Sequence, residues 1–171
     1  LYFCDLMDTS IFISKNFRPK EGRIACESPS NIALIKYWGK YGLQFPINPS
    51  LSFTLSNCKT ETSIEYSPRL KGQDKFDFLY DGKAKKSFEN KIEEFFERIS
   101  LYCPYLENLF LKINSKNTFP HSSGIASSAS AFSSLAFCIV SIEKRFNEKM
   151  TEKNFFNKVS FLARLGSGSG S

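Results

Sequence analysis

Apolar and polar residues alternate along much of the first half of the chain. Successive side chains of a strand point to opposite faces, so the alternation predicts strands over Leu51–Leu55 and Thr60–Tyr66. Two further extended segments are expected over Arg23–Cys26 and Asn31–Gly39, separated by Pro29. The first half of the chain is therefore expected to be rich in strands.

Turn residues and a short apolar run predict the next elements. Phe76–Tyr80 is followed by Asp81-Gly82, a pair typical of β-hairpin turns, so a hairpin is expected there. A short strand is predicted over Leu109–Asn114 and a loop over Asn117–Ser123.

The period then changes to that of helices, with charged residues opposite an apolar face. The first such face is formed by Phe88, Ile92, Phe95, Phe96 and Ile99. A second helix is expected from about Gly124 to near Phe146, and a third after an N-cap at Thr151. The third would bury Phe155, Val159 and Leu162. This order of elements predicts an α+β fold, a mixed sheet with helices on one face.

Composition limits the number of domains and the class of protein. The chain has 171 residues, 42% of them hydrophobic, which is enough for one domain with a phenylalanine-rich core. The net charge of +6 suits phosphorylated small molecules and nucleic acid equally well.

The cysteines and one uncharged run indicate the cellular compartment expected for the protein. The five cysteines, at positions 4, 26, 58, 103 and 138, form no CxxC pair, and there is one histidine, so a disulfide framework or zinc finger is not expected. Free thiols favour a reducing cytoplasm. The uncharged run Ile125–Ile142 is long enough to span a membrane, but six of its residues are Ser, which favours a buried helix.

Both ends of the chain have features of a cut sequence. The first residue is Leu, Met7 is a possible start, and residues 1–10 are expected to be an uncertain or non-native leader. The Gly-Ser run over 166–171, taken alone, is typical of a flexible linker.

The small-residue stretch Pro120–Ser130 is the first candidate for chemistry. It joins a predicted strand to a predicted helix, and the first turn of a helix attracts phosphate through its unpaired N–H groups and its dipole. Gly124 would allow close approach of the backbone, and nearby serines would add donors. Alternatively, the small face formed by Ser127, Ala131, Ser134, Cys138 and Ser141 only lets the helix pack tightly. The stretch lacks the Lys of a P-loop, and the later glycines follow a helix rather than a strand, unlike a dinucleotide fingerprint.

A second candidate follows an apolar run. Lys36 and Lys40 flank Tyr37, and two ammonium groups beside a phenol suit a polyanion, although two solvated lysines would give the same pattern. His121 could act as a general base or be simply solvated.

Three segments together resemble the diphosphomevalonate decarboxylases, a branch of the GHMP kinase superfamily. They are Pro29–Lys40 with Pro46–Ser52, then Asn117–Ser128, then Ala163–Ser169, and they occur in the family's order. The KYWGK motif at 36–40 is specific to this branch, whereas the proline–glycine–Ser-Ser loop is general to the superfamily.

The resemblance implies a fold and a domain boundary. Residues 11–171 would form the ribosomal S5 domain 2-like N-terminal domain of the GHMP kinase fold, truncated and without the C-terminal domain. Gly170 and Ser171 stand where the family has Ala and Cys, and the chain ends before the family's next residue, an Arg. The family's catalytic Asp would lie in the missing domain, so the fragment alone is expected to be inactive.

The resemblance also implies an activity. The family phosphorylates mevalonate 5-diphosphate with ATP and Mg²⁺, and the product loses carbon dioxide and phosphate to give isopentenyl diphosphate. The resemblance further implies that the full-length protein is a cytoplasmic homodimer that acts in isoprenoid biosynthesis. It would have no nucleic-acid or membrane partner.

Site residues are implied by matching positions. ATP would be held by Pro120, Ser122, Ser123, Gly124, Ile125, Ala126, Ser127 and Ser128. Substrate would be held by Asn31, Tyr37, Trp38, Gly39, Lys40, Lys91, Ser167, Gly168, Ser169, Gly170 and Ser171. Lys36 would be the catalytic residue of this half, near the reacting hydroxyl. Lys91 stands loosely where relatives have an Arg and cannot bind in bidentate fashion. Magnesium would enter with ATP rather than on side chains.

Two other functions fit parts of the pattern. A related kinase of the mevalonate 3-kinase type would phosphorylate without decarboxylation. A non-catalytic, basic S5-like module would bind nucleic acid through aromatic and basic residues on an exposed strand face. The Phe residues follow buried periods instead.

Overall fold

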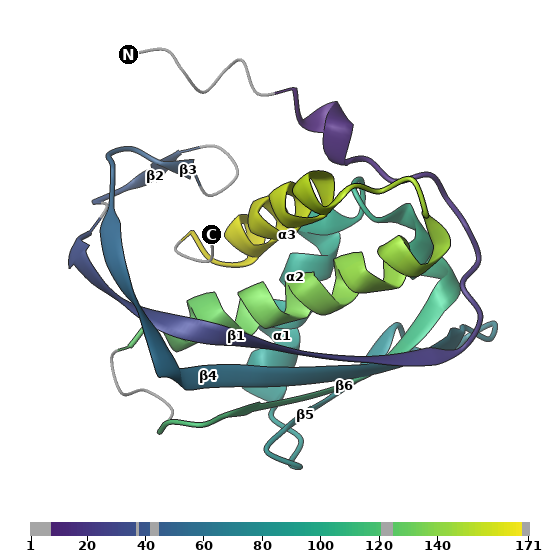
Figure 1. Cartoon of the computed structure of the whole chain (residues 1–171). Coiled ribbons are helices and arrows are strands. Elements are labelled where there is room, and N and C mark those ends of the chain that lie inside the picture. Colours follow the sequence, from purple (N-terminus) through teal and green to yellow (C-terminus); the bar gives the residue numbers. More distant parts are fainter. Residues whose placement is uncertain (1–7, 37, 42–44, 121–124, 169–171) are drawn as a thin grey trace.

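A four-stranded sheet with helices on one side forms the body of the protein (Figure 1). The structure is a computed structural model that describes residues 8–36, 38–41, 45–120 and 125–168. The sheet, in the order β1-β4-β6-β5, consists of β1 Gly22–Ile35, β4 Leu51–Pro68, β6 Leu109–Asn117 and β5 Phe76–Tyr80. A small second sheet pairs β2 Lys40–Tyr41 with β3 Phe45–Pro46. The helices are α1 Lys86–Ile99, α2 Ser127–Phe146 and α3 Glu152–Gly166, with 3₁₀ turns η1 Thr9–Phe12 and η2 Pro104–Asn108.

The pairing of strands makes the sheet mixed, as the sequence predicts. β4 is antiparallel to both β1 and β6, whereas β5 is parallel to β6. The helices lie above one face (Figure 1), and the α+β prediction is confirmed. The other face is polar, with Glu65 and Lys112 exposed on neighbouring strands.

β1 differs from the prediction of two segments separated by Pro29. It is one strand whose register against β4 shifts between Pro29 and Ser30, so a bulge absorbs the proline. β1 ends at Ile35, and the prediction that extended structure continues to Gly39 is therefore wrong. The two strands predicted within 51–66 are likewise a single strand, β4.

The hairpin predicted at Asp81-Gly82 is wrong in its second strand. Both residues have positive φ, and Tyr80 and Lys83 exchange backbone hydrogen bonds of 2.8 and 3.0 Å, so the tight turn does form. Only Lys83 bridges back, and the chain then enters α1. α1 carries the chain across to β6, which is why β5 and β6 can be parallel.

The predicted helices are confirmed, with α2 beginning a few residues later than expected. The Thr151 hydroxyl accepts from the N–H of Asn154, which confirms the predicted N-cap. Phe155, Val159 and Leu162 are buried as expected. α2 packs on β1 and β4, and α3 packs on α2 (Figure 1). No helix in the described ranges is long and apolar enough to cross a membrane.

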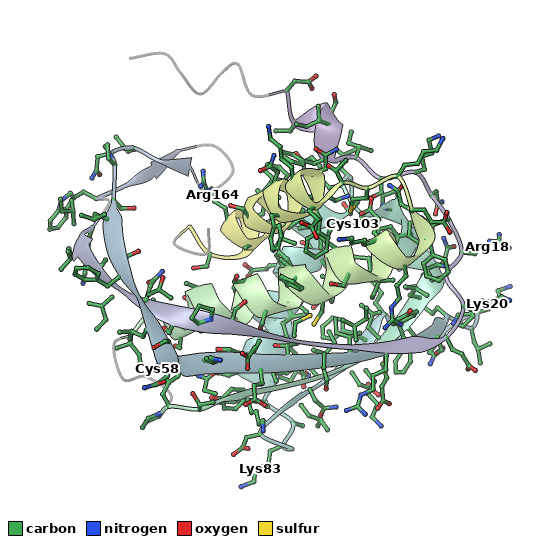
Figure 2. All side chains as sticks on the ribbon, in the orientation of Figure 1. Arg18, Lys20, Cys58, Lys83, Cys103 and Arg164 are labelled. Atoms are coloured by element: carbon green, nitrogen blue, oxygen red, sulfur yellow. The ribbon has the colours of Figure 1, made fainter. Side chains whose placement is uncertain are left out.

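The segment before β1 is held to the helices by a buried charged group. Lys158 of α3 forms a 2.8 Å ion pair with Glu143 of α2. It also donates to Ser14 Oγ and to the carbonyl of Tyr102, so all three ammonium hydrogens have partners. In Figure 2, by contrast, the labelled Arg18, Lys20 and Lys83 lie at the periphery of the molecule.

Candidate functional site

The three segments that carry the resemblance gather at one end of the molecule. This end holds the start of α2, the end of α3 and the small β2–β3 sheet (Figure 1). The hydroxyls of Ser128 at the start of α2 and Ser167 after α3 lie 3.4 Å apart. The fold therefore brings a residue predicted to bind ATP into contact with one predicted to bind substrate.

The start of α2 is a left-handed bend rather than a capped turn. Ala126 has φ 40° and ψ 41°, and it has no polar side chain with which to cap the helix. The first-turn N–H groups at Ser127 and Ser128 thus face the site without a side-chain cap, an arrangement that favours an anion. Ser30 of β1 donates to the carbonyl of Ile125 and ties this bend to the sheet.

A set of hydroxyl contacts, which we call the hydroxyl layer, joins α2 to the sheet behind this bend. Its members are Ser28, Thr60, Thr62 and Ser115 on the strands and Ser130, Ser133 and Ser134 on α2. The contacts Thr60–Ser130 and Thr62–Ser134 are 2.7 and 2.6 Å long and buried. The tight packing expected of the small-residue face is therefore present at Ser134, and the hydroxyl layer also ties the start of α2 to the sheet.

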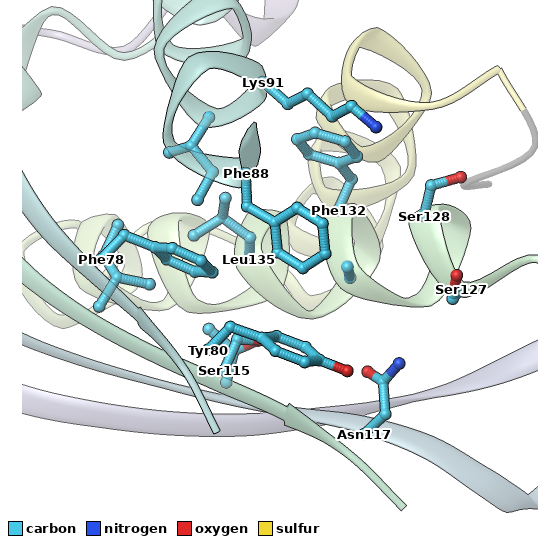
Figure 3. Close-up of a pocket in the computed structure, with 14 residues that line it drawn as sticks. Phe78, Tyr80, Phe88, Lys91, Ser115, Asn117, Ser127, Ser128, Phe132 and Leu135 are labelled. Carbon is cyan, nitrogen blue, oxygen red and sulfur yellow. The ribbon is translucent and has the colours of Figure 1, made fainter. Parts of the chain in front are cut away.

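A cavity of about 150 Å³ opens beside the first turn of α2 (Figure 3). Aromatic rings from three elements form much of its wall: Tyr80 at the end of β5, Phe88 on α1 and Phe132 on α2. Ser127 and Ser128 line the same cavity. An apolar cavity of this size has room for an aromatic ring.

Polar groups enter the cavity from the ends of β5 and β6 and from α1. Burial, with a contribution from Asp81, raises the pKa of Tyr80, so its phenol stays protonated. Asn117 lies near the Tyr80 hydroxyl in Figure 3. Lys91, predicted to bind the substrate diphosphate, lines this cavity together with Ser127 and Ser128, which are predicted to bind ATP.

The Lys36–Trp38 segment is held by a residue to which sequence reasoning assigned no role. Asn48 Oδ1 accepts from the N–H of Trp38 at 2.8 Å, and its Nδ2 donates to the carbonyl of Lys36 at 3.2 Å. Lys36 is exposed and Trp38 is 90% exposed, so both side chains are available to a ligand. In the sequence, the position of Asn48 within the Pro46–Ser52 segment was the only indication that this residue could belong to the site.

The other predicted substrate residues are only partly described. Asn31 of β1 and Gly39 are half-buried, and Lys40 is placed in β2 by its backbone. The chain turns back after Gly39, whose carbonyl accepts from Ile47 N–H at 3.0 Å.

The end of α3 is packed closely against α1 and α2. Arg98 of α1 donates to the carbonyl of Leu165 at 3.1 Å, which places a cation at the negative end of the α3 dipole. A Cβ at Gly166 would overlap the ring of Phe132, so only glycine fits there. Gly166 was not among the predicted site residues. Its place at the end of a predicted helix was the sequence signal that could have identified it.

Several predicted residues lie outside the described part of the chain. They are Tyr37, His121, Ser122, Ser123, Gly124, Ser169, Gly170 and Ser171. Of the predicted ATP loop, the structure places Pro120 before the gap and Ile125 to Ser128 after it. Gly168 is described and buried. Among described residues, no three His, Cys, Asp or Glu side chains cluster as a metal site.

Comparisons with known proteins show which family the chain resembles. The family model described as "Diphosphomevalonate decarboxylase-like N-terminal domain" matches residues 28–171. Diphosphomevalonate decarboxylase mvd1 of Aspergillus fumigatus is 32% identical over 162 residues, covering 86% of this chain and 38% of its own. The enzyme of Schizosaccharomyces pombe is 35% identical, covering 83% and 37%.

Solved structures give the same result for the fold. The mevalonate diphosphate decarboxylase from Staphylococcus aureus matches with a TM-score of 0.67 and 34% identity over 88% of this chain and 42% of that one. The enzyme from Enterococcus faecalis matches with a TM-score of 0.66 and 32% identity over 88% and 44%. Another neighbour, with a TM-score of 0.66, was solved in complex with MVAPP, AMPPCP and magnesium.

The chain spans about two fifths of the length of the curated relatives it matches. The match over 28–171 covers most of the chain and includes every segment that forms the candidate site. The chain therefore belongs to the diphosphomevalonate decarboxylase family, in which it corresponds to the N-terminal domain.

Proposed function

We propose that this chain is the N-terminal half of an ATP-dependent decarboxylase, and that it carries the ATP-binding site and part of the substrate-binding site. The whole enzyme would convert mevalonate 5-diphosphate to isopentenyl diphosphate, ADP, phosphate and carbon dioxide. The observation that carries the proposal is the 3.4 Å contact between Ser128 and Ser167. Phosphoryl transfer depends on positioning the two reactants, and this contact puts the proposed nucleotide and substrate loops side by side.

ATP would lie along the start of α2. The base would enter the aromatic cavity, and the phosphates would meet the loop before α2 and the first turn with Ser127 and Ser128. Lys91, which the resemblance assigns to the substrate diphosphate, lines the cavity proposed for the nucleotide, so here we assign its cation to the ATP phosphates. Mg²⁺ would be bound through the phosphates. The neighbour solved with AMPPCP and magnesium supports this assignment.

The substrate diphosphate would lie on the far side of the Ser128–Ser167 contact. We assign it to the segment after β1 and to the Gly-Ser run after α3, in which Ser167 and Gly168 are described. Lys36 would neutralise the charge that develops on the transferred phosphoryl group and on the leaving phosphate. The catalytic carboxylate would come from a C-terminal domain.

The finer features remain part of the proposal. They are a ribosomal S5 domain 2-like fold over residues 11–171, a cytoplasmic homodimer, and small-molecule partners rather than nucleic acid or membrane. In support of the last point, the polar face of the sheet pairs charges of both signs, as between Lys116 and Glu61 at 3.0 Å.

The test is a product assay on a full-length protein that contains this chain. Mevalonate 5-diphosphate with ATP and Mg²⁺ should yield isopentenyl diphosphate and carbon dioxide. A stable 3-phosphate would show a kinase without decarboxylation, and RNA binding with steep salt dependence but no ATP binding would show the nucleic-acid module. The 171-residue chain alone should be inactive, and decarboxylation by it would contradict the division of roles between domains.

Two lysine variants of the full-length protein separate catalysis from binding. Lys36→Ala should lower kcat by more than it raises KM, because its cation acts on the transferred phosphoryl group. Lys40→Ala should chiefly raise KM, because its cation acts on the bound diphosphate. Steady-state kinetics measures both, and equal effects on kcat and KM in the two variants would reject these roles.

A further inference from the structure

Asn117, the last residue of β6, presents a carboxamide to the aromatic cavity. Figure 3 shows its side chain near the Tyr80 hydroxyl, with Ser127 beyond it. The residue is half-buried, and it was predicted only as the start of a loop. Its position gives the cavity a polar group that can form hydrogen bonds with the edge of a bound ring.

One end of this carboxamide is fixed by the hydroxyl layer. Thr60 donates its hydroxyl to Asn117 Oδ1 at 2.9 Å, and the same hydroxyl contacts Ser130. A carboxamide has two acceptor lone pairs and two N–H donors. Asn117 thus keeps one acceptor site and both donors for a ligand, as it makes no other side-chain hydrogen bond in the described part of the chain.

This pairing pattern distinguishes adenine from guanine. Adenine carries an amino donor beside a ring-nitrogen acceptor, and a carboxamide binds both at once. Guanine places acceptors at O6 and N7, so a carboxamide in the same orientation would set its oxygen against O6. Inverting the carboxamide would set its oxygen against N7 instead, and it would also lose the bond from Thr60.

We propose that Asn117 is the specificity-determining residue for the nucleotide, and that it selects adenine by two hydrogen bonds to the base edge in the cavity formed with Tyr80, Phe88 and Phe132. This inference rests on the proposed function, since it requires a nucleotide in this cavity. A bidentate pair of this kind discriminates between bases by about tenfold to a hundredfold.

The experiment measures MgATP and MgGTP affinities of the 171-residue chain by calorimetry. Asn117→Asp replaces the donor by an acceptor, which cannot pair with the ring nitrogen of adenine. A carboxylate can instead accept from the N1–H and N2–H groups on the Watson–Crick edge of guanine, so the ATP-to-GTP affinity ratio should fall at least tenfold. Asn114→Asp is the matched control. It introduces the same charge on the same strand but on the opposite, polar face of the sheet, and it should leave the ratio unchanged.

Asn117→Ala keeps the inference testable if the aspartate variant does not fold. It removes both hydrogen bonds, so ATP and GTP should bind with nearly equal affinity. An unchanged ratio in a folded Asn117 variant would overturn the role of Asn117 while leaving the proposed function intact, because ATP would still bind. Failure of the unmodified chain to bind either nucleotide would overturn both.

Discussion

The two halves of α2 contact their neighbours through different chemistry. The first half, at the candidate site, lies on the sheet through the hydroxyl layer, in which Ser130 and Ser134 meet threonines of β4. The second half buries Ile139, Val140 and Ile142 completely and ends in the Glu143–Lys158 ion pair. Hydrogen bonds are directional and contribute little net stability, whereas apolar burial is non-directional and contributes more. The site end is therefore organised for orientation and the far end for stability.

The largest loss of stability is expected when one charge of the ion pair in the second half of α2 is removed. Glu143→Ala should lower the free energy of unfolding by about 3–5 kcal/mol, because Lys158 would stay buried without its counter-ion. Urea denaturation measures the change. The double variant Glu143→Leu/Lys158→Met should recover most of the loss, and failure to recover would show that the pair itself, rather than an unpaired charge, sets the cost.

An apolar truncation tests the same half without charge. Ile139→Ala should cost about 2–5 kcal/mol, since the side chain is fully buried in the core. MgATP affinity of the folded variant should stay within twofold, because Ile139 is not among the cavity-lining residues. A large loss of affinity at full folding would mean that the two halves of α2 are not separable.

In the hydroxyl layer, a substitution should lower stability less and ATP affinity more than Ile139→Ala does. Ser134→Ala leaves the buried Thr62 hydroxyl with one partner fewer and should cost about 1–3 kcal/mol. MgATP affinity should fall as well, because α2 loses a contact that orients its start. Ser160→Ala, a half-buried serine of α3, is the control and should change stability by less than about 0.5 kcal/mol. A Ser134→Ala variant with full ATP affinity would contradict an orienting role.

The smallest effect is expected on the polar face of the sheet, away from both halves of α2. Lys59→Ala removes an exposed pair with Glu27 and should change stability by less than about 1 kcal/mol. Denaturation at low and high salt should show that the difference shrinks as salt rises. A salt-independent loss above this value would show that the pair is structurally more important than its exposure indicates.

The sequence predicted local structure better than pairing. The helical period found α1 and α3 to within a few residues, and Thr151 was found because a cap depends on its own neighbours. The hairpin at Asp81-Gly82 was wrong because a turn signal specifies a turn and not the partner strand. Pro29 was placed between two strands because the sequence does not show that a bulge on an edge strand would absorb it.

The candidate site was predicted in its parts and not in its assembly. Motif residues at 36–40, 120–128 and 167–171 were named from the sequence, but it gave no distance between them. The contacts of Asn48 and Gly166, and the role proposed for Asn117, depend on the tertiary structure, because each residue acts on another segment of the chain or on a cavity shared by several elements.

The sequence by itself determined the α+β class, the family and the identity of most candidate residues, since periodicity, caps and motifs are written in neighbouring residues. Only the tertiary structure decided that β5 runs parallel to β6, that Ser128 meets Ser167, and that Tyr80, Phe88 and Phe132 enclose one cavity. These are contacts between residues far apart in the chain. They are selected by the packing of the whole domain, in which α2 must satisfy hydroxyls at one end and bury apolar side chains at the other.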